Sequence, residues 1–287
     1  MTVTSQLPPS LIATLPGRYY TDPAVFALEQ SRIFEAGWFC CVRSADLTTP
    51  GCFETVQIGQ ESVLIARGCD GALNAFRNAC RHRGARLCTD DRGAVKRSFR
   101  CPYHAWTYGL DGKLITVPNL TDMPDIDRTK YGLTWLAVRE WLGYAWVCLA
   151  DDPPSFEDTV IAQVTGRLGG PEEIDAYRID ELGLGRRINL VPDHVIVHRM
   201  FPRGPDRTLV RCDWLYLPEV IESGADLSRS VELFHRVNQQ DFEACERCQL
   251  TMGSRAYARG GVLVPSEHHI GAFHDWLRAK IKNLRGG

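Results

Sequence analysis

Two short stretches decide the fold: Cys80-Arg81-His82-Arg83-Gly84 and Cys101-Pro102-Tyr103-His104-Ala105-Trp106. The first pairs a cysteine with a histidine as Cys-x-His and the second as Cys-x-x-His, and eighteen residues separate the two pairs. Two thiolates and two imidazoles therefore come from two loops. This donor set suits a two-iron, two-sulfide cluster to which each loop gives one ligand per iron. The candidate cluster ligands, which are also the candidate metal ligands, are Cys80, His82, Cys101 and His104.

A structural zinc ion is the alternative for these four residues, because two cysteines and two histidines also suit a tetrahedral zinc site. Zinc ribbons and fingers usually place both cysteines in one knuckle, whereas each loop here mixes Cys with His. The sequence therefore favours the iron–sulfur cluster. Gly84 permits a tight loop backbone, and Trp106 and Tyr103 are expected to shield the cluster from water.

Length and composition limit the class of protein. The chain has 287 residues, of which 44% are hydrophobic and 24% charged, which excludes disordered and collagen-like classes. A formal net charge of -2 gives no broad positive field for nucleic acid. The longest uncharged apolar window, residues 141–150, is too short to span a bilayer, and no secretory signal is visible. We expect a cytoplasmic protein that binds neither nucleic acid nor membranes.

The chain contains 11 cysteines, an odd number that argues against a disulfide framework in a reducing compartment. Six of them lie in apolar or strand-like stretches and are expected to be buried: Cys40, Cys41, Cys52, Cys69, Cys148 and Cys212. Cys245 and Cys248 form a Cys-x-x-Cys pair within a helical pattern, for which helix packing is expected rather than redox chemistry.

Local patterns predict an α+β protein in three parts. Asp22 before Pro23 is expected to cap a helix that ends near residue 36, within an N-terminal segment of residues 1–45. Residues 46–150 are expected to form an antiparallel all-β domain, with strands over 53–58 and 62–66 and turns at Asp70-Gly71 and Asp111-Gly112. Two acids and two prolines at 151–154 mark the predicted boundary to a third part, residues 151–287.

The third part is expected to combine an antiparallel sheet with C-terminal helices. Residues 194–200 and 208–217 are β-branched and aromatic-rich, which predicts a hairpin around the loop at 202–207. Two amphipathic helices are predicted to follow. Their expected buried stripes are Leu227, Val231, Phe234 and Val237 in the first, and Ile270, Phe273, Leu277 and Ile281 after a Ser266 cap in the second.

The two ligand motifs resemble the Rieske motif of the alpha subunits of Rieske non-haem iron oxygenases, the aromatic-ring-hydroxylating dioxygenase family. The stretches at 15–38, 110–113, 192–217 and 240–249 also resemble that family, so the resemblance covers nearly the whole chain. It is closest to the branch that oxidises carnitine, choline or glycine betaine. The resemblance implies an all-β Rieske [2Fe-2S] domain followed by a helix-grip catalytic domain.

The resemblance also implies a reaction and partners. In that family a reductase or ferredoxin, driven by NAD(P)H, supplies single electrons to the Rieske cluster. They pass to a mononuclear Fe(II), usually in the neighbouring subunit of a head-to-tail trimer. That iron, held by two histidines and a carboxylate, activates dioxygen to hydroxylate or demethylate a small organic substrate. The implied function is therefore that of a Rieske-type oxygenase alpha subunit.

The two-histidine segment of that family has no counterpart in this sequence. Arg186-Arg187-Ile188 resembles the approach to it, and residues 189–193 resemble a strand well beyond it, so an internal block is missing and the catalytic domain is truncated. Asp241 matches the carboxylate ligand but is an orphan, and we expect mononuclear iron not to be bound by this chain. Apolar surface left by the missing block is expected to cause poor solubility or oligomerisation.

Other histidines are weak replacements for the lost pair. His194 and His198 lie in a predicted strand, where four residues span roughly 13 Å, so they cannot share one ion. His269 and His274 show the family's four-residue gap, but that step turns roughly 140° on a helix. A surrogate triad of His269, His274 and Asp241 is therefore a minor alternative to histidines that flank the apolar stripe of that helix.

Three hypotheses for the function remain open. The first is an oxygenase alpha subunit, the second an electron-transfer module or inactive relic without the mononuclear iron, and the third a zinc-stabilised structural domain. Arg81, Arg83 and Arg86 fit either the docking of an acidic reductase or an ordinary solvated surface. The substrate is not readable from the sequence, because the missing block is expected to line its pocket.

Overall fold

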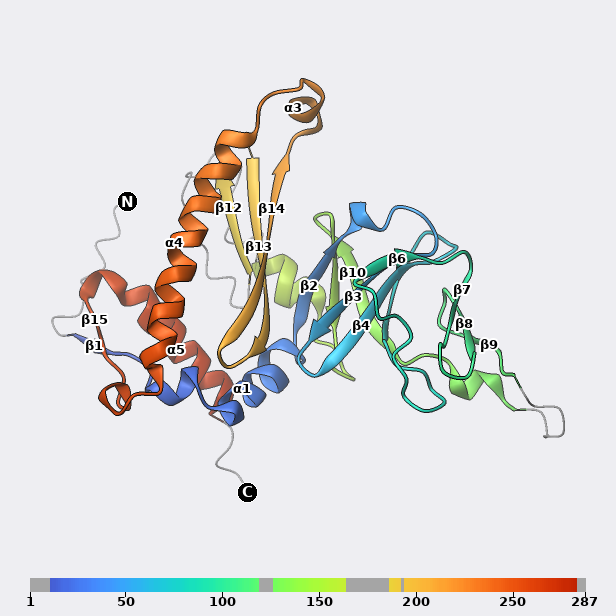
Figure 1. Ribbon diagram of the computed structural model, residues 1–287, viewed down its shortest axis with the longest axis horizontal. Coiled ribbons are helices and arrows are strands. Elements are labelled where there is room, and N and C mark those ends of the chain that lie inside the picture. Colours follow the sequence, from blue (N-terminus) through green and yellow to red (C-terminus); the bar gives the residue numbers. More distant parts are fainter. Residues whose placement is uncertain (1–10, 119–125, 164–185, 192–193, 283–287) are drawn as a thin grey trace. The chain divides into compact units, whose positions relative to one another are not determined.

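The chain divides into two compact units in the computed structural model, which describes residues 11–118, 126–163, 186–191 and 194–282 (Figure 1). The β unit comprises residues 34–163, and the α+β unit comprises residues 1–33 together with 164–287. The predicted N-terminal segment, residues 1–45, is therefore shared between the two units. Trp38 Nε1 donates to the carbonyl of Pro154 at 2.7 Å, so the chain remains in contact with the β unit at the predicted boundary.

The β unit is built on a seven-stranded antiparallel sheet in the order β2-β11-β10-β5-β4-β3-β6. Its strands are β2 (Trp38–Arg43), β3 (Cys52–Ile58), β4 (Glu61–Arg67), β5 (Leu73–Arg77), β6 (Arg92–Ala94), β10 (Trp135–Trp141) and β11 (Tyr144–Cys148). A second antiparallel sheet contains β7 (Ser98–Arg100), β8 (Thr107–Gly109) and β9 (Leu114–Thr116). The prediction of an antiparallel β domain, with strands near 53–58 and 62–66, is confirmed.

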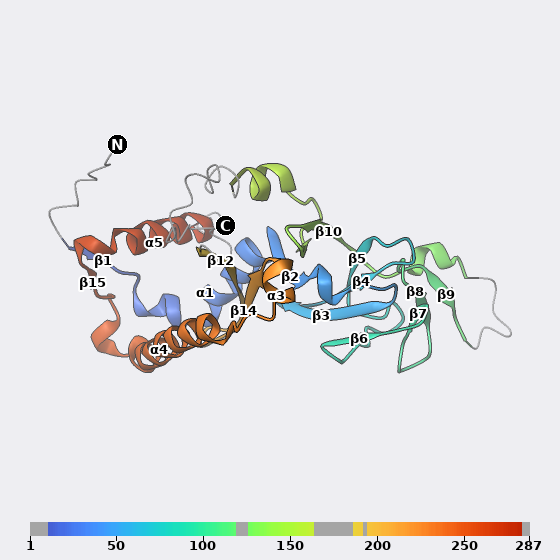
Figure 2. The same ribbon diagram turned by 90° about the horizontal axis from the view of Figure 1, so that it is seen from above.

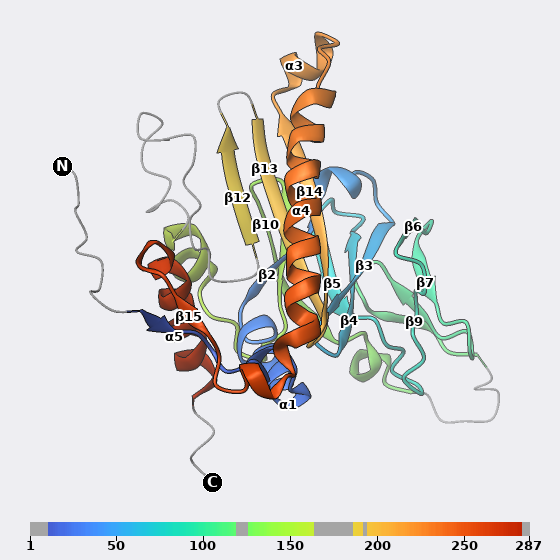
Figure 3. The same ribbon diagram turned by 60° about the vertical axis from the view of Figure 1, so that its left-hand side comes forward.

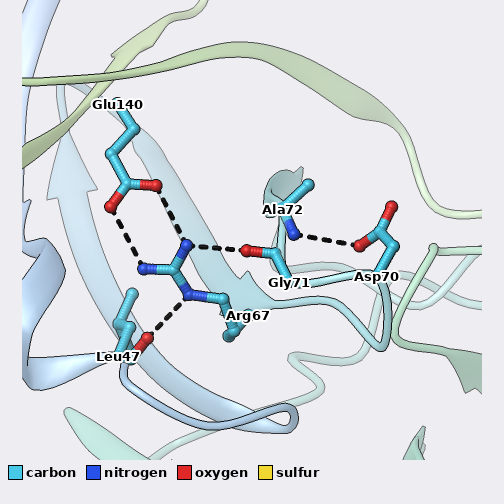
Figure 4. Close-up of polar contacts among 6 residues, drawn as sticks. All are labelled: Leu47, Arg67, Asp70, Gly71, Ala72 and Glu140. Atoms are coloured by element: carbon cyan, nitrogen blue, oxygen red, sulfur yellow. Dashed lines mark hydrogen bonds and ion pairs between the residues drawn. The ribbon is translucent and has the colours of Figure 1, made fainter.

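The turn between β4 and β5 shows how local chemistry fixes this sheet (Figure 4). Gly71 has a φ of 81°, which glycine adopts without a steric cost, and Asp70 Oδ1 accepts the N–H of Ala72 at 3.0 Å. Beside the turn, Arg67 donates to both carboxylate oxygens of Glu140 on β10, at 2.9 and 3.2 Å. These hydrogen bonds lower the pKa of the Glu140 carboxyl, so the ion pair ties β4 to β10 at neutral pH.

The main hydrophobic cluster of the β unit joins side chains of both sheets. The rings of Phe53 on β3 and Phe99 on β7 meet edge to face with their centroids 5.8 Å apart. Cys80 and Cys101 belong to the same buried cluster and are each only 3% exposed. The two candidate ligand loops therefore start from the packed interior of the unit.

The α+β unit contains a three-stranded antiparallel sheet, β12 (Arg186–Val191), β13 (His194–Gly204) and β14 (Arg207–Tyr216), in the order β12-β13-β14. The predicted hairpin of 194–200 and 208–217 is confirmed. The helix α3 (Pro218–Glu222) follows, and then α4 (Ser228–Met252) runs along the sheet (Figures 1 and 3). No Gly or Pro interrupts α4, whose C-cap is Gly253, and both helices predicted for this part are present.

The contact between α4 and the sheet is narrow. His194 packs edge to face against Phe234, and His198 Nε2 lies 3.3 Å from Asn238 Oδ1. Within the described residues no side chain of α4 is buried, and Leu250, for example, is 86% exposed. None of the helices in the described part combines the length and apolar composition that a membrane crossing requires.

The N-terminal residues of the α+β unit pack against its C-terminal end. The short strands β1 (Ile12–Ala13) and β15 (Val262–Leu263) pair antiparallel, beside one end of α5 (His268–Ile281) (Figure 2). Asp22 accepts the N–H of Ala24 at 2.8 Å and caps α1 (Pro23–Glu29), which a π-helical turn extends to Phe34. The predicted cap is confirmed, and the helical path ends two residues before the predicted position.

The buried face of α5 differs from the predicted stripe. Leu277 and Ile281 are buried as expected, but Ile270 and Phe273 are 43% and 48% exposed, and Gly271 and His274 are buried in their place. Helical periodicity cannot distinguish the predicted stripe, 270/273/277/281, from the observed one, 271/274/277/281, because the two have their last two members in common. His274 turns inward because Nε2 of its ring lies 3.3 Å from the hydroxyl of Tyr20.

The predicted burial of the cysteines is correct for some and wrong for others. Cys40, Cys41 and Cys148 are buried, and Cys52 and Cys212 are half-buried. Cys69 is exposed because it lies in the turn after β4 rather than in the strand, and Cys245 and Cys248 are exposed because α4 buries no side chain there. The expectation that Cys245 and Cys248 serve helix packing is therefore wrong for this chain.

Glu29, the last residue of α1, gives the α+β unit a pH-dependent stability. Burial raises the pKa of its carboxyl from 4.5 to about 7, so the folded unit favours the protonated form. The free energy of unfolding is therefore highest below about pH 4.5, falls as the pH rises to about 7 and is level above that value. We expect Glu29→Gln to raise the free energy of unfolding by about 2 kcal/mol relative to the wild type at pH 8 and to leave it unchanged at pH 4.

Thermal or urea unfolding at the two pH values checks this prediction. The matched control is Glu246→Gln at an exposed position of α4, which should leave the free energy of unfolding unchanged at both pH values. An equal effect of Glu29→Gln at both pH values would contradict the assignment.

Candidate metal centre

The first ligand loop is a closed turn held at both ends. The N–H of Cys80 donates to the carbonyl of Ala85 at 2.8 Å, and the N–H of Gly84 donates to the carbonyl of Cys80 at 2.9 Å. Asn78, which is 3% exposed, accepts the N–H of Cys88 at 3.0 Å and donates to the carbonyl of Cys88 at 2.7 Å. The side chain of Asn78 therefore fixes the end of the loop relative to its start.

The second loop, between β7 and β8, repeats the same pattern. The N–H of Cys101 donates to the carbonyl of Trp106 at 2.8 Å, and the N–H of Ala105 donates to the carbonyl of Cys101 at 3.0 Å. The fifth residue of each loop also has a positive φ, 70° at Gly84 and 57° at Ala105. The two loops are thus local copies of one backbone design, each beginning with a buried cysteine.

The four candidate ligands form two pairs. The thiols of Cys80 and Cys101 belong to one buried cluster and interact with each other. The imidazoles of His82 and His104 are exposed at the loop tips, with ring centroids 4.8 Å apart. Each pair takes one member from each loop, so the loops present a buried sulfur pair and an exposed nitrogen pair.

The protonation of these groups follows from their surroundings. Burial is the main cause that raises the pKa of the Cys80 thiol, and the hydrogen bond from Tyr108 opposes it. Partial desolvation, followed by the charges of His104 and Arg83, lowers the pKa of His82. Neutral imidazoles and thiols that lose their protons to a metal are the forms that ligate iron, so the donor set fits an iron–sulfur cluster.

Tyr108 contacts the sulfur pair through its hydroxyl. Its fully buried hydroxyl donates to Cys80 Sγ at 3.2 Å and accepts the N–H of Arg81 at 3.0 Å. Burial and the bond to Cys80 raise the pKa of the phenol, so it remains a donor. The sequence reasoning did not assign this role to Tyr108 or the loop-closing role to Asn78, and the only signal was their closeness to the motif.

The aromatic residues of the second loop have different roles. Trp106 is buried and stacks on the ring of His82, with centroids 5.0 Å apart and planes 4° apart. The ring centroid of Tyr103 lies 3.8 Å from that of His104, but the Tyr103 side chain is 59% exposed. The predicted shielding therefore applies to Trp106, whereas Tyr103 faces solvent because it occupies the tip of the loop.

The repeated positive φ predicts opposite effects for two exchanges. An L-residue pays about 1–2 kcal/mol in the left-handed region, which glycine avoids. We expect Ala105→Gly to stabilise the β unit by about 0.5 kcal/mol, since the flexibility of glycine offsets part of the gain. Gly84→Ala should cost about 1 kcal/mol through the backbone alone, because an added Cβ meets nothing within 4 Å. Urea unfolding measures both, and destabilisation by Ala105→Gly would contradict the equivalence of the loops.

The residues considered for a mononuclear metal site lie on α4 and α5. Asp241 is exposed on α4, His269 is exposed on α5, and His274 is buried against Tyr20. Across the described ranges, no group of three or more His, Cys, Asp or Glu side chains is arranged to hold a single metal ion. The predicted role of Asp241 therefore gains no support from its surroundings.

His194 and His198 lie in β13, as predicted, and each contacts a residue of α4. His198 Nε2 also lies 3.4 Å from Cys212 Sγ. Burial, followed by the charge of Asp213, raises the pKa of the Cys212 thiol to about 11. Such a thiol is protonated and unreactive at neutral pH, so this contact serves packing.

Comparison with known families agrees with this geometry. Residues 37–128 match the Rieske [2Fe-2S] domain, and residues 187–283 match the catalytic domain of the ring-hydroxylating alpha subunit. The chain therefore contains a region that matches a Rieske domain, followed by a region that matches a ring-hydroxylating catalytic domain.

Its curated relatives include oxygenases of quaternary ammonium compounds. The chain is 44% identical to the glycine betaine monooxygenase oxygenase subunit of Chromohalobacter salexigens over 167 residues, which are 58% of this chain and 36% of that protein. It is 34% identical to the carnitine monooxygenase oxygenase subunit of Escherichia coli over 145 residues, 50% of this chain and 38% of that protein. The matches thus cover little more than a third of these relatives.

A longer match covers most of both chains. The chain is 23% identical to the chloroplastic choline monooxygenase of Spinacia oleracea over 355 positions, which include 96% of this chain and 80% of that protein. Since this chain has 287 residues, roughly 80 aligned positions have no residue here.

Solved structures confirm the fold class. The apo form of the quaternary ammonium Rieske monooxygenase CntA has a TM-score of 0.78 at 23% identity, over 95% of this chain and 96% of that chain. Naphthalene 1,2-dioxygenase from Rhodococcus has a TM-score of 0.72 at 16% identity, over 94% and 95% of the two chains. The predicted α+β class, with a sheet-rich Rieske domain before a catalytic domain with C-terminal helices, is therefore correct.

Proposed function

We propose that this chain accepts single electrons at a [2Fe-2S] cluster held by Cys80, His82, Cys101 and His104. The observation that carries the proposal is the repeated loop design, which pairs one buried thiol and one exposed imidazole from each loop. The sulfur pair suits one iron and the nitrogen pair suits the other. When bound, the cluster supplies reversible one-electron transfer at a higher potential than an all-cysteine cluster.

The surrounding residues bind and orient the ligands. Asn78 and the paired backbone hydrogen bonds hold the loops, and Tyr108 donates to Cys80 Sγ. Trp106 covers one face of His82 and excludes water from it. The outer edges of His82 and His104 remain exposed, so a redox partner has access to the nitrogen side of the site.

The pairing favours this cluster over zinc. A tetrahedral zinc ion requires all four donors around a single point. Here the thiols converge in the core while the imidazoles converge at the surface, and within the described chain no three of these donors are arranged around one ion. The zinc alternative is therefore less well supported.

We further propose that the chain descends from an oxygenase that hydroxylates or demethylates a small quaternary ammonium compound. Its similarity to glycine betaine and carnitine monooxygenases supports this substrate class. A reductase or ferredoxin as electron donor and a homo-oligomer, a trimer in the family, belong to the same proposal, as does a cytoplasmic location. Inter-subunit electron transfer is described for a structurally similar quaternary ammonium Rieske monooxygenase, and this favours the oligomer.

A separate candidate is an electron-transfer module that does not activate oxygen by itself. The placement of Asp241, His269 and His274 in different surroundings favours it for this chain. Mononuclear Fe(II) is then not bound by this chain.

Anaerobic reductive titration with iron and sulfide analysis tests the proposal. We expect two irons, two sulfides and one accepted electron per chain. Oxygen uptake coupled to glycine betaine or carnitine, together with a third iron, would support the oxygenase over the electron-transfer module. Protein that contains one zinc and accepts no electron would contradict the proposed function.

Tyr108→Phe is expected to lower the midpoint potential of the cluster. The variant loses the hydroxyl that donates to Cys80 Sγ at 3.2 Å, and hydrogen bonds to cluster sulfur stabilise the reduced, more negative state. A hydrogen bond of about 1 kcal/mol corresponds to a decrease of roughly 40 mV for one electron. Protein film voltammetry measures the shift, with Tyr144→Phe on β11 as the control. An unchanged potential would show that Tyr108 does not act on the cluster.

A further inference from the structure

The Cys-x-x-Cys pair of α4 has no role in the candidate metal centre. Cys245 and Cys248 are both free, exposed thiols, three residues apart in a helix that no Gly or Pro interrupts. Residues three positions apart on a helix are neighbours on one face, with about 5–6 Å between their Cβ atoms. α4 therefore presents two thiols side by side to solvent.

The two thiols lie on the face of α4 that contacts the rest of the α+β unit (Figure 3). Asn238 contacts His198 of β13, and one turn before the end of the helix Gln249 Nε2 donates to the carbonyl of Tyr20 at 2.9 Å. Cys245 follows Asn238 by seven residues and precedes Gln249 by four, which are close to whole turns of a helix. Since both thiols are exposed, this face is open between the two contacts.

A third sulfur lies one turn beyond the pair. Met252 follows Cys248 by four residues, so it lies on the same face, and it is half-buried at the end of the helix. Its backbone packs closely on the N-terminal segment, since a Cβ on Gly17 would lie 2.1 Å from the Met252 carbonyl oxygen. Residues 245–252 therefore carry two thiols and one thioether along one helix face.

This donor set selects a soft metal ion. Thiolate and thioether sulfur favour Cu(I), whereas a structural zinc ion takes four ligands. In the part of the chain that the structure describes, no three His, Cys, Asp or Glu side chains are arranged around one ion, so zinc lacks its remaining ligands here. Cu(I) is satisfied by two or three sulfur donors, which is what this face offers.

A disulfide is the competing use of the pair. The Cβ atoms of a disulfide lie about 3.5–4.5 Å apart, which is closer than neighbours on a regular helix. Closing the disulfide would therefore distort the uninterrupted helix. A bound ion places two metal–sulfur bonds between the sulfurs and spans the gap without moving the backbone.

We propose that Cys245 and Cys248 chelate one Cu(I) ion, with Met252 as a third donor. Each thiol loses its proton to solvent when its sulfur binds the ion, and no electron is transferred. The proposal does not depend on the iron–sulfur cluster, because the candidate ligands of the cluster all belong to the β unit. It assigns the α+β unit a binding site of its own.

Anaerobic titration of the full chain with Cu(I), in competition with the coloured Cu(I) chelator bicinchoninate, tests the proposal. The double variant Cys245→Ser, Cys248→Ser should bind one Cu(I) fewer than the wild type. Each single variant should weaken that site by at least about 100-fold, and Met252→Leu should weaken it by about tenfold. The matched control is Cys69→Ser, which removes an exposed thiol from a turn and should leave the affinity unchanged.

The iron content is recorded before and after the titration, so that displacement of cluster iron is not counted as binding to α4. Circular dichroism verifies that each variant keeps its helices. X-ray absorption of the copper complex should show two or three sulfur neighbours around the ion.

Three outcomes would overturn the proposed site. The first is an equal number of tightly bound Cu(I) ions in the wild type and the double variant. The second is a copper ion surrounded by nitrogen instead of sulfur. The third is one Cu(I) per two chains, with a dimer that forms when copper is added, because the ion would then bridge two copies rather than two turns of one helix.

Discussion

Cys101→Ala is expected to remove the iron–sulfur cluster almost completely. Cys101 is 3% exposed in the main hydrophobic cluster of the β unit, so water cannot easily replace its thiolate on the iron. Cys88 is the nearest spare thiol in the sequence of the first loop, but Asn78 holds its backbone, and burial raises the pKa of its thiol to about 12. A spare thiolate is therefore not available, and the iron content should fall more than tenfold.

The matched control for this prediction is Cys148→Ala. Cys148 is fully buried in β11, away from the ligand loops, and the exchange removes a similar thiol from the same unit. Iron and sulfide analysis of the two variants, with circular dichroism to verify folding, should show loss of the cluster only for Cys101→Ala. Equal retention in both variants would exclude Cys101 as a ligand.

The combined exchange of His82→Cys and His104→Cys is expected to lower the midpoint potential by at least about 250 mV. Two neutral imidazoles would be replaced by two thiolates, whose negative charges disfavour the added electron. The resulting all-cysteine cluster should approach the roughly -400 mV of plant-type ferredoxins, whereas Rieske clusters lie at about -150 mV or higher. Both rings are exposed at the loop tips, so the exchange leaves the buried core unchanged.

Spectroelectrochemical titration measures this shift. His235→Cys, on the exposed face of α4, adds a thiol without touching the loops and should leave the potential at the wild-type value. A double variant that retains its cluster at the wild-type potential would show that the two histidines do not ligate iron.

The sequence could predict the candidate ligands of the centre because they lie in short, closely spaced motifs. The Cys-x-His and Cys-x-x-His pairs name all four residues, and the turn at Asp70-Gly71 and the cap at Asp22 follow from local backbone chemistry. Asn78 and Tyr108 could not be assigned in the same way. Their roles depend on which loop atoms the folded sheet brings within hydrogen-bonding distance, and no periodic pattern encodes that.

Long-range packing was harder to predict. Residues near the N-terminus pair with residues near the C-terminus, as Ile12 does with Leu263, and a local pattern has no information on such pairs. The sequence pattern placed the buried face of α5 one residue away from its observed position. The observed face includes His274 because its ring contacts the hydroxyl of Tyr20, more than 200 residues earlier in the chain. Cys69 was expected to be buried because it follows a strand-like stretch, but it lies in the turn after β4 and is exposed.

The central claim is that one iron has two sulfur ligands from the protein and the other has two nitrogen ligands. Mössbauer spectroscopy of iron-57-enriched protein after one-electron reduction tests it most directly. The structure predicts two inequivalent irons in equal amounts, a ferric site with thiolate ligands and a ferrous site with imidazole ligands. Two equivalent sulfur-ligated irons, or a folded protein that contains zinc and no iron, would contradict it.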